Sequence, residues 1–341
     1  MSKIENVSIK IQTGVYGQFR NLKNTVWYAL GEYVDNAVQS FESNRKRLLE
    51  NNNNDYQFEV RIDIDNENNF IRIFDNAAGI DSVNFQRAFE PAHIPIDNTG
   101  LHEFGMGMKT ASIWLANLWT VETAALGEDE LRFVEFDLDK VLKEEQELLS
   151  VKNIDKSPNV HYTEIVLHDL SMNAPSNHQI DKIKRHLLSI YRKFIRKGDM
   201  KLFINDEELI YEEPEILKAP YYNNPQGEAI EWKKEINFST GKYKVSGFIA
   251  ILNTMSTSTL NGLSLFRRGR VIEGSHDEKY RPKVLCGQVG SPRYKRIFGE
   301  LELEGFAVSF NKGSFQEQED LEALMEAIQT EISNKDFIFF I

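Results

Sequence analysis

The sequence predicts a mixed α/β protein with two domains, because segments of helical and of strand periodicity follow one another along its 341 residues. Apolar residues recur at three- and four-residue spacing from Val26 to Phe41, which predicts an amphipathic helix. Two strand-like runs between residues 58 and 74 flank the turn segment 66–69, which predicts a hairpin. A chain of this length can bury two cores of ordinary size.

Glu32 and Asn36 lie four residues apart in the predicted helix, so they share the face that points away from the apolar stripe. Such a face fits a nucleotide cavity in which the amide binds a metal ion and the carboxylate polarises a water. For an isolated pair of this kind, an ordinary solvated helix face is the commoner explanation.

Two further segments contain the residue types of nucleotide recognition. Asp75 ends the second predicted strand and is followed by the small residues 77–79, so an adenine amine can donate to its carboxylate while the base approaches the backbone. An ordinary Asp-Asn turn is the alternative. Residues 104–109, Phe-Gly-Met-Gly-Met-Lys, precede an apolar segment at 110–119 that looks helical. Glycines before a helix leave amides that can bind an anion.

In this order the three segments resemble the ATP-binding boxes of the GHKL superfamily, which includes the gyrase B subunit, MutL, the large heat-shock chaperones, sensor histidine kinases and the MORC ATPases. The resemblance implies a two-layer α/β sandwich of the Bergerat type that binds ATP and Mg and hydrolyses ATP. It implies Glu32 as the general base and Asn36 as the magnesium ligand. The motifs are most similar to those of MORC-type and MutL-type members.

The same resemblance implies the nucleotide contacts. Asp75 and Gly79 would form the adenine box, and Thr163, in the strand-like run 162–167, would support the adenine. Phosphate contacts would come from the third box, which comprises Gly105, Met106, Gly107, Met108 and Lys109. Three residues depart from the family pattern: Tyr33 in the first box, Ala77 in place of the first glycine of the second, and Tyr162 in place of a glycine before Thr163.

Residues 80–104 show little periodicity, and by the resemblance they form the lid that closes over ATP. The second half contains two expected helices, at 179–197 and 318–332, and strand-like pieces at 201–205, 243–252, 262–273 and 301–310. By the resemblance this half is a transducer-type α/β domain, so the expected domains are 1–175 for ATP binding and 176–341 for the transducer. Residues 310–315 resemble a MORC motif that implies Lys312 as a switch lysine for the γ-phosphate. Without that match, a single loop lysine would be taken for surface decoration.

The composition indicates an intracellular, cytoplasmic protein. The single cysteine, Cys286, excludes an intrachain disulfide and fits a reducing compartment. A run of about 18 apolar residues is absent, so we expect no membrane contact. The N-terminus lacks the apolar run of a signal peptide. The apolar end at 337–341 leaves open whether the natural chain continues past Ile341.

The net charge is −12, but basic residues gather in two clusters in the second half. Seven lie within 182–197, and the second cluster comprises Arg267, Arg268, Arg270, Arg281, Lys283, Arg293, Lys295 and Arg296. DNA contact and a solvated surface both remain open. By the resemblance, ATP binding would close a clamp by joining two copies into a homodimer, which could act on DNA. A chaperone or scaffold for protein clients and a slow-turnover nucleotide-sensing regulator are the alternatives.

Overall fold

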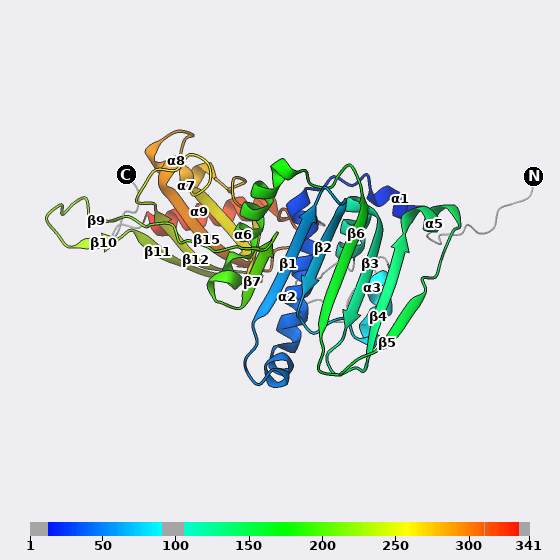
Figure 1. Cartoon of the computed structure of the whole chain (residues 1–341). Helices are drawn as coiled ribbons and strands as arrows, with labels where there is room; N and C mark the ends of the chain where they lie inside the picture. The colour runs from blue at the N-terminus through cyan, green and yellow to red at the C-terminus, as the bar shows by residue number, and fades with distance from the viewer. Residues whose placement is uncertain (1–12, 91–105, 310, 334–341) are drawn as a thin grey trace, which may run out of the picture. The chain divides into compact units, whose positions relative to one another are not determined.

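The computed structural model describes residues 13–90, 106–309 and 311–333, which divide into two compact units. The first unit ends at Ile180 but also contains Met200–Glu208, and the second contains Asp181–Asp199 and the residues from Leu209 onward. Each unit combines a main sheet with helices, so the mixed α/β prediction is confirmed (Figure 1). Within the described residues, no helix is both long enough and apolar enough to cross a membrane.

The first unit is built on a sheet of eight strands in the order β5-β4-β3-β6-β2-β1-β7-β8. All neighbours are antiparallel except β1 and β7. The strands are β1 (Phe58–Asp65), β2 (Phe70–Asp75), β3 (Ala116–Ala124), β4 (Glu130–Asp137), β5 (Val151–Asp155), β6 (Tyr162–Leu170), β7 (Met200–Ile204) and β8 (Glu207–Glu208). The predicted hairpin is therefore confirmed as β1 and β2. The strand expected at 201–205 in the second domain instead lies beside β1 in this sheet.

Helices α2 and α3 lie behind this sheet in Figure 1. The helices of the unit are α1 (Val15–Phe19), α2 (Val26–Asn51), α3 (Ser82–Phe89), α4 (Gly107–Leu115) and α5 (Leu138–Lys143), and a 3-10 turn spans Asn177–Gln179. The predicted apolar stripe of α2 is buried from Val26 to Phe41, whose ring stacks on that of Phe58 in β1. Side chains alternate along a strand, so β1 buries one set and leaves the other partly exposed.

Two sequence predictions in this unit are corrected. The helix expected over 110–119 ends at Leu115, because the residues after it alternate between buried and partly exposed positions and form β3. The expected lid contains helix α3, whose first turn is capped where Asn84 N donates to Asp81 Oδ1 at 2.8 Å. The rest of that segment, 91–105, lies outside the described residues.

The second unit has a sheet of five strands in the order β11-β12-β15-β13-β14, in which only β13 and β15 are parallel. These strands are β11 (Lys233–Thr240), β12 (Tyr243–Ile251), β13 (Gly262–Arg267), β14 (Arg270–Glu273) and β15 (Ile297–Glu304). The small hairpin β9 (Lys218–Pro220) and β10 (Ala229–Glu231) precedes them. The helices are α6 (Ile180–Arg196), α7 (Lys283–Cys286), α8 (Pro292–Arg296) and α9 (Gln318–Ile332).

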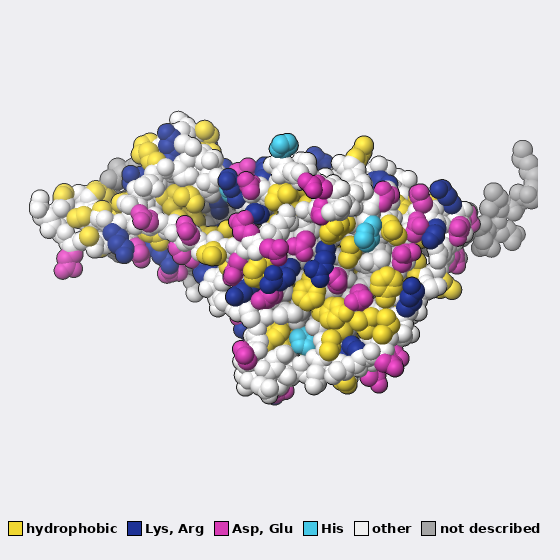
Figure 2. Space-filling view, viewed as in Figure 1, with side chains coloured by type: hydrophobic (Ala, Val, Ile, Leu, Met, Phe, Trp, Pro, Cys, Tyr) yellow, Lys and Arg dark blue, Asp and Glu magenta, His cyan; other side chains and the backbone are white. Residues whose placement is uncertain are grey.

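The basic helix α6 packs on the sheet of its own unit through ion pairs. Arg192 is 1% exposed, and its Nε lies 2.7 Å from Glu300 Oε1 on β15. Lys193 Nζ lies 2.6 Å from Glu302 Oε2, and Arg196 Nη2 lies 2.9 Å from Glu300 Oε1. On the face shown in Figure 2, basic and acidic side chains are likewise intermixed. Much of the first basic cluster is therefore neutralised inside the unit and is not a solvated face.

Candidate functional site

The first feature of the site is a close approach between α2 and the start of α4. Glu32 is only 9% exposed, whereas Asn36, one turn later, is half-buried. A Cβ atom placed on Gly107 would lie 1.9 Å from Oε2 and 2.8 Å from Cδ of Glu32. Because a Cβ at this position would push the Glu32 side chain away, the glycine is required for the carboxylate to lie at the N-terminus of α4. The explanation of Glu32 as a residue on a solvated helix face is therefore wrong.

Polar and buried residues join α2 to α4 at this point. The hydroxyl of Tyr33 shares a 2.9 Å hydrogen bond with Oγ of Ser112 on α4. Burial raises the pKa of Tyr33 above its ordinary value, so the side chain is a neutral phenol. Tyr33 is thus the residue of the first box that departs from the family, and here it ties the two helices together. Asp35 beside it is fully buried.

The N-terminus of α4 has the features of an anion site. Met106 is its N-cap residue, and no described side chain caps this end. The amides of Gly107 and Met108 fall in the first turn, where helix amides lack carbonyl partners within the helix. Four residues of the predicted phosphate box are described, and Gly105 lies outside the described residues.

The Lys109 side chain, which the sequence predicted as a phosphate contact, binds carbonyl oxygens of α3 in this structure. Its ammonium donates to the carbonyl oxygens of Arg87 at 3.1 Å and Ala88 at 3.0 Å, in the last turn of α3. A cation at a helix C-terminus is favourable, and the contact holds α3 close to α4. Burial, with a smaller contribution from Arg87, lowers the pKa of Lys109 to about 8. A phosphate contact from this ammonium would require it to leave α3.

The second part of the site is a row of three residues across adjacent strands. Asp75 on β2 pairs in register with Thr163 on β6, which pairs with Thr123 on β3. The two threonine hydroxyls share a 3.2 Å hydrogen bond. Ile80 N donates to Thr123 Oγ1 at 2.9 Å, so the chain after Asp75 is attached to β3. The structure thus brings Asp75 and Thr163 together, and it adds Thr123, which only strand register reveals.

Asp75 is a carboxylate without a cationic partner in the described part of the chain. It accepts a hydrogen bond from Ala77 N at 3.0 Å, and no ion pair joins it to a lysine or arginine there. Burial raises the pKa of Asp75 to about 7, since little compensates for the loss of water. Such a group can accept a hydrogen bond from a neutral donor, as an exocyclic amine of a base would provide.

The segment after Asp75 has a fixed backbone. Gly79 has a φ of +72°, and a Cβ there would lie 2.1 Å from the carbonyl oxygen of Ala124, so only glycine fits. Ala77 has no left-handed φ, which explains why alanine replaces the family glycine without strain. His161 Nδ1 lies 2.9 Å from the carbonyl oxygens of both Asn76 and Ala77 and donates to them. No sequence pattern predicted this role for His161.

The predicted switch lysine lies in the second unit. Lys312 is 4% exposed and has a left-handed φ of 52°. Its N–H donates to Ser309 O at 2.8 Å, and its carbonyl accepts from Arg270 Nη1 at 2.9 Å. The explanation of Lys312 as surface decoration is therefore wrong. Its assignment to the γ-phosphate stays a prediction.

Residues 24–168 match the family model described as "Histidine kinase-, DNA gyrase B-, and HSP90-like ATPase". The match includes Glu32, Asn36, Asp75, Thr163 and the start of α4, and it covers less than half of the chain. No curated protein matches the chain. The family model supports a GHKL-type ATP-binding domain in the first unit.

The residues present fit ATP and magnesium. The helix N-terminus at Gly107, with the Glu32 carboxylate beside it, suits a phosphate. The half-buried acceptor Asp75 suits the amine of a base. No group of three or more His, Cys, Asp or Glu that could hold a metal occurs in the described residues. Magnesium bound through phosphates needs only one or two protein ligands, and the Asn36 side chain offers one oxygen.

Proposed function

We propose that the first unit binds ATP with magnesium and hydrolyses it. One observation supports this most strongly: the Glu32 carboxylate lies against Gly107 at the N-terminus of α4. An anion bound by the α4 amides would therefore be next to a carboxylate that can accept a proton.

Each residue of the site has a part in this proposal. Asp75 binds the adenine amine, and Thr163 and Thr123 hold the adjoining strands. Asn36 is the magnesium ligand, and magnesium when bound neutralises phosphate charge. Glu32 accepts the proton of the attacking water on a carboxylate oxygen, which is held close to the α4 amides.

The test compares Glu32→Gln with Glu42→Gln, because Glu42 is an exposed glutamate on the same helix. We expect the turnover of ATP, measured by phosphate release with magnesium, to fall by about a hundred- to ten-thousand-fold in Glu32→Gln. Affinity for an ATP analogue, measured by calorimetry, should be retained, because the adenine contacts lie elsewhere. Wild-type turnover in Glu32→Gln would exclude Glu32 as the base, and a wild-type protein that binds no nucleotide would overturn the proposal.

The proposal extends to ATP-dependent pairing of two copies, with Lys312 reporting the γ-phosphate. Support comes from the motif at 310–315 and from the burial of Lys312, an arrangement that ordinary loop lysines lack. Lys312→Met should reduce the dimer fraction that sedimentation detects with an ATP analogue, and Lys283→Met, at an exposed position of the same unit, should not. Equal dimer fractions for Lys312→Met and wild type would remove Lys312 from this role.

DNA remains a proposed partner through the basic residues that are exposed. Arg192, Lys193 and Arg196 are paired with acids. Arg185, Lys197 and Lys283 are three exposed residues of the clusters that can meet phosphates. Reversing these three to Glu should weaken DNA retention in gel shifts at low salt without changing ATP turnover. Absence of retention by the wild type, with and without nucleotide, would favour the scaffold for protein clients.

A further inference from the structure

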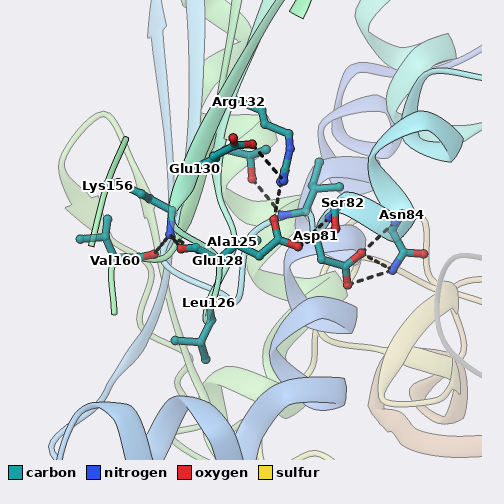
Figure 3. A network of polar contacts seen from close by, with 12 residues as sticks. Asp81, Ser82, Asn84, Ala125, Leu126, Glu128, Glu130, Arg132, Lys156 and Val160 are labelled. Atoms are coloured by element: carbon teal, nitrogen blue, oxygen red, sulfur yellow. Dashed lines mark hydrogen bonds and ion pairs between the residues drawn. The ribbon is translucent and has the colours of Figure 1, made fainter. Parts of the chain in front are cut away.

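The ammonium of Lys156, directly after β5, lies among four backbone carbonyl oxygens (Figure 3). It donates to Glu128 O at 2.5 Å, Ala125 O at 2.9 Å, Val160 O at 3.0 Å and Ser157 O at 3.3 Å. An ammonium has three N–H donors, so at least one is shared. A ring of carbonyl oxygens around a positive charge has the chemistry of a cation site, and here the protein supplies the cation itself.

These carbonyls belong to two segments that adjoin the adenine box. The turn after β3 contains Leu126, whose N–H donates to Ala78 O at 2.9 Å, and this turn follows the Ala124 carbonyl against which Gly79 packs. The segment 157–160 leads directly into His161, whose ring holds the carbonyls of Asn76 and Ala77. Lys156 therefore joins the two segments that fix the backbone after Asp75.

The same turn also holds the start of α3. Glu128 Oε1 accepts from Ser82 N at 2.9 Å and from Ser82 Oγ at 2.8 Å, so it binds the first turn of that helix. Arg132 Nη1 lies 2.5 Å from Glu128 Oε2, and its guanidinium lies 5.6 Å from the ring centre of Phe85 on α3. Figure 3 shows these contacts running from Lys156 through Glu128 to Ser82.

We propose that Lys156 is a positioning residue for nucleotide binding, which fixes the turn 125–128 and so couples the backbone after Asp75 to helix α3. The inference rests on the proposed function, because it assigns the adenine box to a nucleotide. Lys156 acts through carbonyls and does not touch the base. By linkage, binding of the base stabilises the turn and the start of α3.

The first experiment compares Lys156→Met with Lys152→Met, because Lys152 lies on β5, the strand that precedes Lys156, with its Nζ over the Phe133 ring. The KM for ATP and the Kd of an ATP analogue should rise about tenfold or more in Lys156→Met, because charge-assisted hydrogen bonds are lost. kcat at saturating ATP should change much less, since Glu32 and Gly107 are untouched. Lys152→Met should behave as the wild type.

A rescue experiment separates positioning from general stability. Lys156→Ala leaves four carbonyl oxygens without a cation, so ammonium or potassium chloride should restore affinity, whereas choline chloride at equal ionic strength should not. Equal restoration by choline would overturn the inference. Wild-type affinity in Lys156→Met, together with nucleotide binding by the wild type, would overturn it while leaving the proposed function in place.

Hydrogen exchange on the wild type gives a result even if the variants fail to fold. The amides of Leu126 and Ser82 should exchange more slowly when an ATP analogue is bound. Unchanged exchange at both amides in the nucleotide-bound protein would overturn the coupling.

Discussion

Two carboxylates, the half-buried Asp75 of the first unit and the buried Glu300 of the second, have opposite electrostatic environments. Asp75 in the first unit accepts a hydrogen bond from a backbone amide, and burial raises its pKa to about 7. Glu300 in the second unit lies beside Arg192 and Arg196. Burial alone would raise the pKa of Glu300, but the two guanidinium groups lower it to about 2. Removing one partner from a buried ion pair destabilises the fold, whereas a carboxylate without a cationic partner is suited to a ligand.

The basic side chains of α6 are likewise paired inside the second unit. Arg192 and Lys193 belong to the most basic stretch of the chain, yet both meet acids of β15. A cluster of like charges in a sequence therefore says little about binding until its partners are known. In this protein the two acids that pair with Arg192 and Lys193 come more than a hundred residues later.

The largest expected effect concerns the paired charge. Arg192→Met leaves Glu300 with one guanidinium in a buried position, so the second unit should lose about 3 kcal/mol of stability. Urea unfolding followed by fluorescence measures this loss, and Arg185→Met, at an exposed position of the same helix, serves as the control. Equal midpoints for the two variants would contradict the view that the pair stabilises the fold.

The next effect concerns the unpaired carboxylate. In the folded protein Asp75 keeps its proton up to a pH of about 7, whereas the unfolded chain releases it near 3.8. The free energy of unfolding of the wild type therefore falls as the pH rises above 3.8, because the folded protein disfavours the charged form of Asp75. Asp75→Asn removes this loss. The free energy of unfolding of Asp75→Asn, relative to wild type, should rise by roughly 2 to 3 kcal/mol between pH 5 and pH 8.

The control for this measurement is Asp55→Asn, because Asp55 is exposed. Asp75→Asn should also lose affinity for an ATP analogue, since the amide can present a donor where the adenine amine needs an acceptor. A pH profile parallel to that of wild type, or retained affinity, would show that Asp75 is not held as an unpaired acceptor. For Glu300 we expect the opposite pH dependence of the free energy of unfolding. Its stabilising contribution is present above about pH 4.5 and is lost as the pH falls toward 2.

The smallest effect concerns the glycine that admits Glu32. An alanine at 107 would displace only the end of a side chain, so Gly107→Ala should cost little stability. ATP turnover should nevertheless fall about tenfold or more, because the carboxylate is pushed from its place. Gly241→Ala is the matched control, since a Cβ there meets nothing within 4 Å. Turnover equal to that of the control would show that Gly107 is not needed to place the Glu32 carboxylate for catalysis.

Local patterns predicted the elements of the first unit that carry the site. The stripe from Val26 to Phe41 and the hairpin β1–β2 are encoded by short-range periodicity and turn residues, and the strand containing Thr163 was predicted from the family resemblance. Periodicity failed at Leu115, where an apolar run changes from helix to strand without a glycine or proline. It also failed for α3, a short helix inside a segment expected to be a loop.

Contacts between distant segments could not be predicted in this way. Thr123 joins the site only through the register of β3 with β6, and Lys156 acts through backbone carbonyls, which every residue possesses. Glu32 and Gly107 are far apart in the sequence, so no local pattern predicts that the Glu32 side chain lies against Gly107. The burial of Lys312 likewise depends on the packing of a loop in the second unit.

The parallel pairing of β1 with β7 has a consequence for how the chain is synthesised and divided. The polypeptide leaves the first sheet after β6, forms most of α6 in the other unit, and then returns to add β7 and β8. A fragment ending at residue 175 would lack both strands and leave the hydrogen-bonding edge of β1 uncovered between Phe58 and Ile62, as a template for association with other chains. During synthesis the first sheet cannot be completed until Glu208 has left the ribosome. Helix α6 of the second unit is therefore synthesised before the first unit is complete.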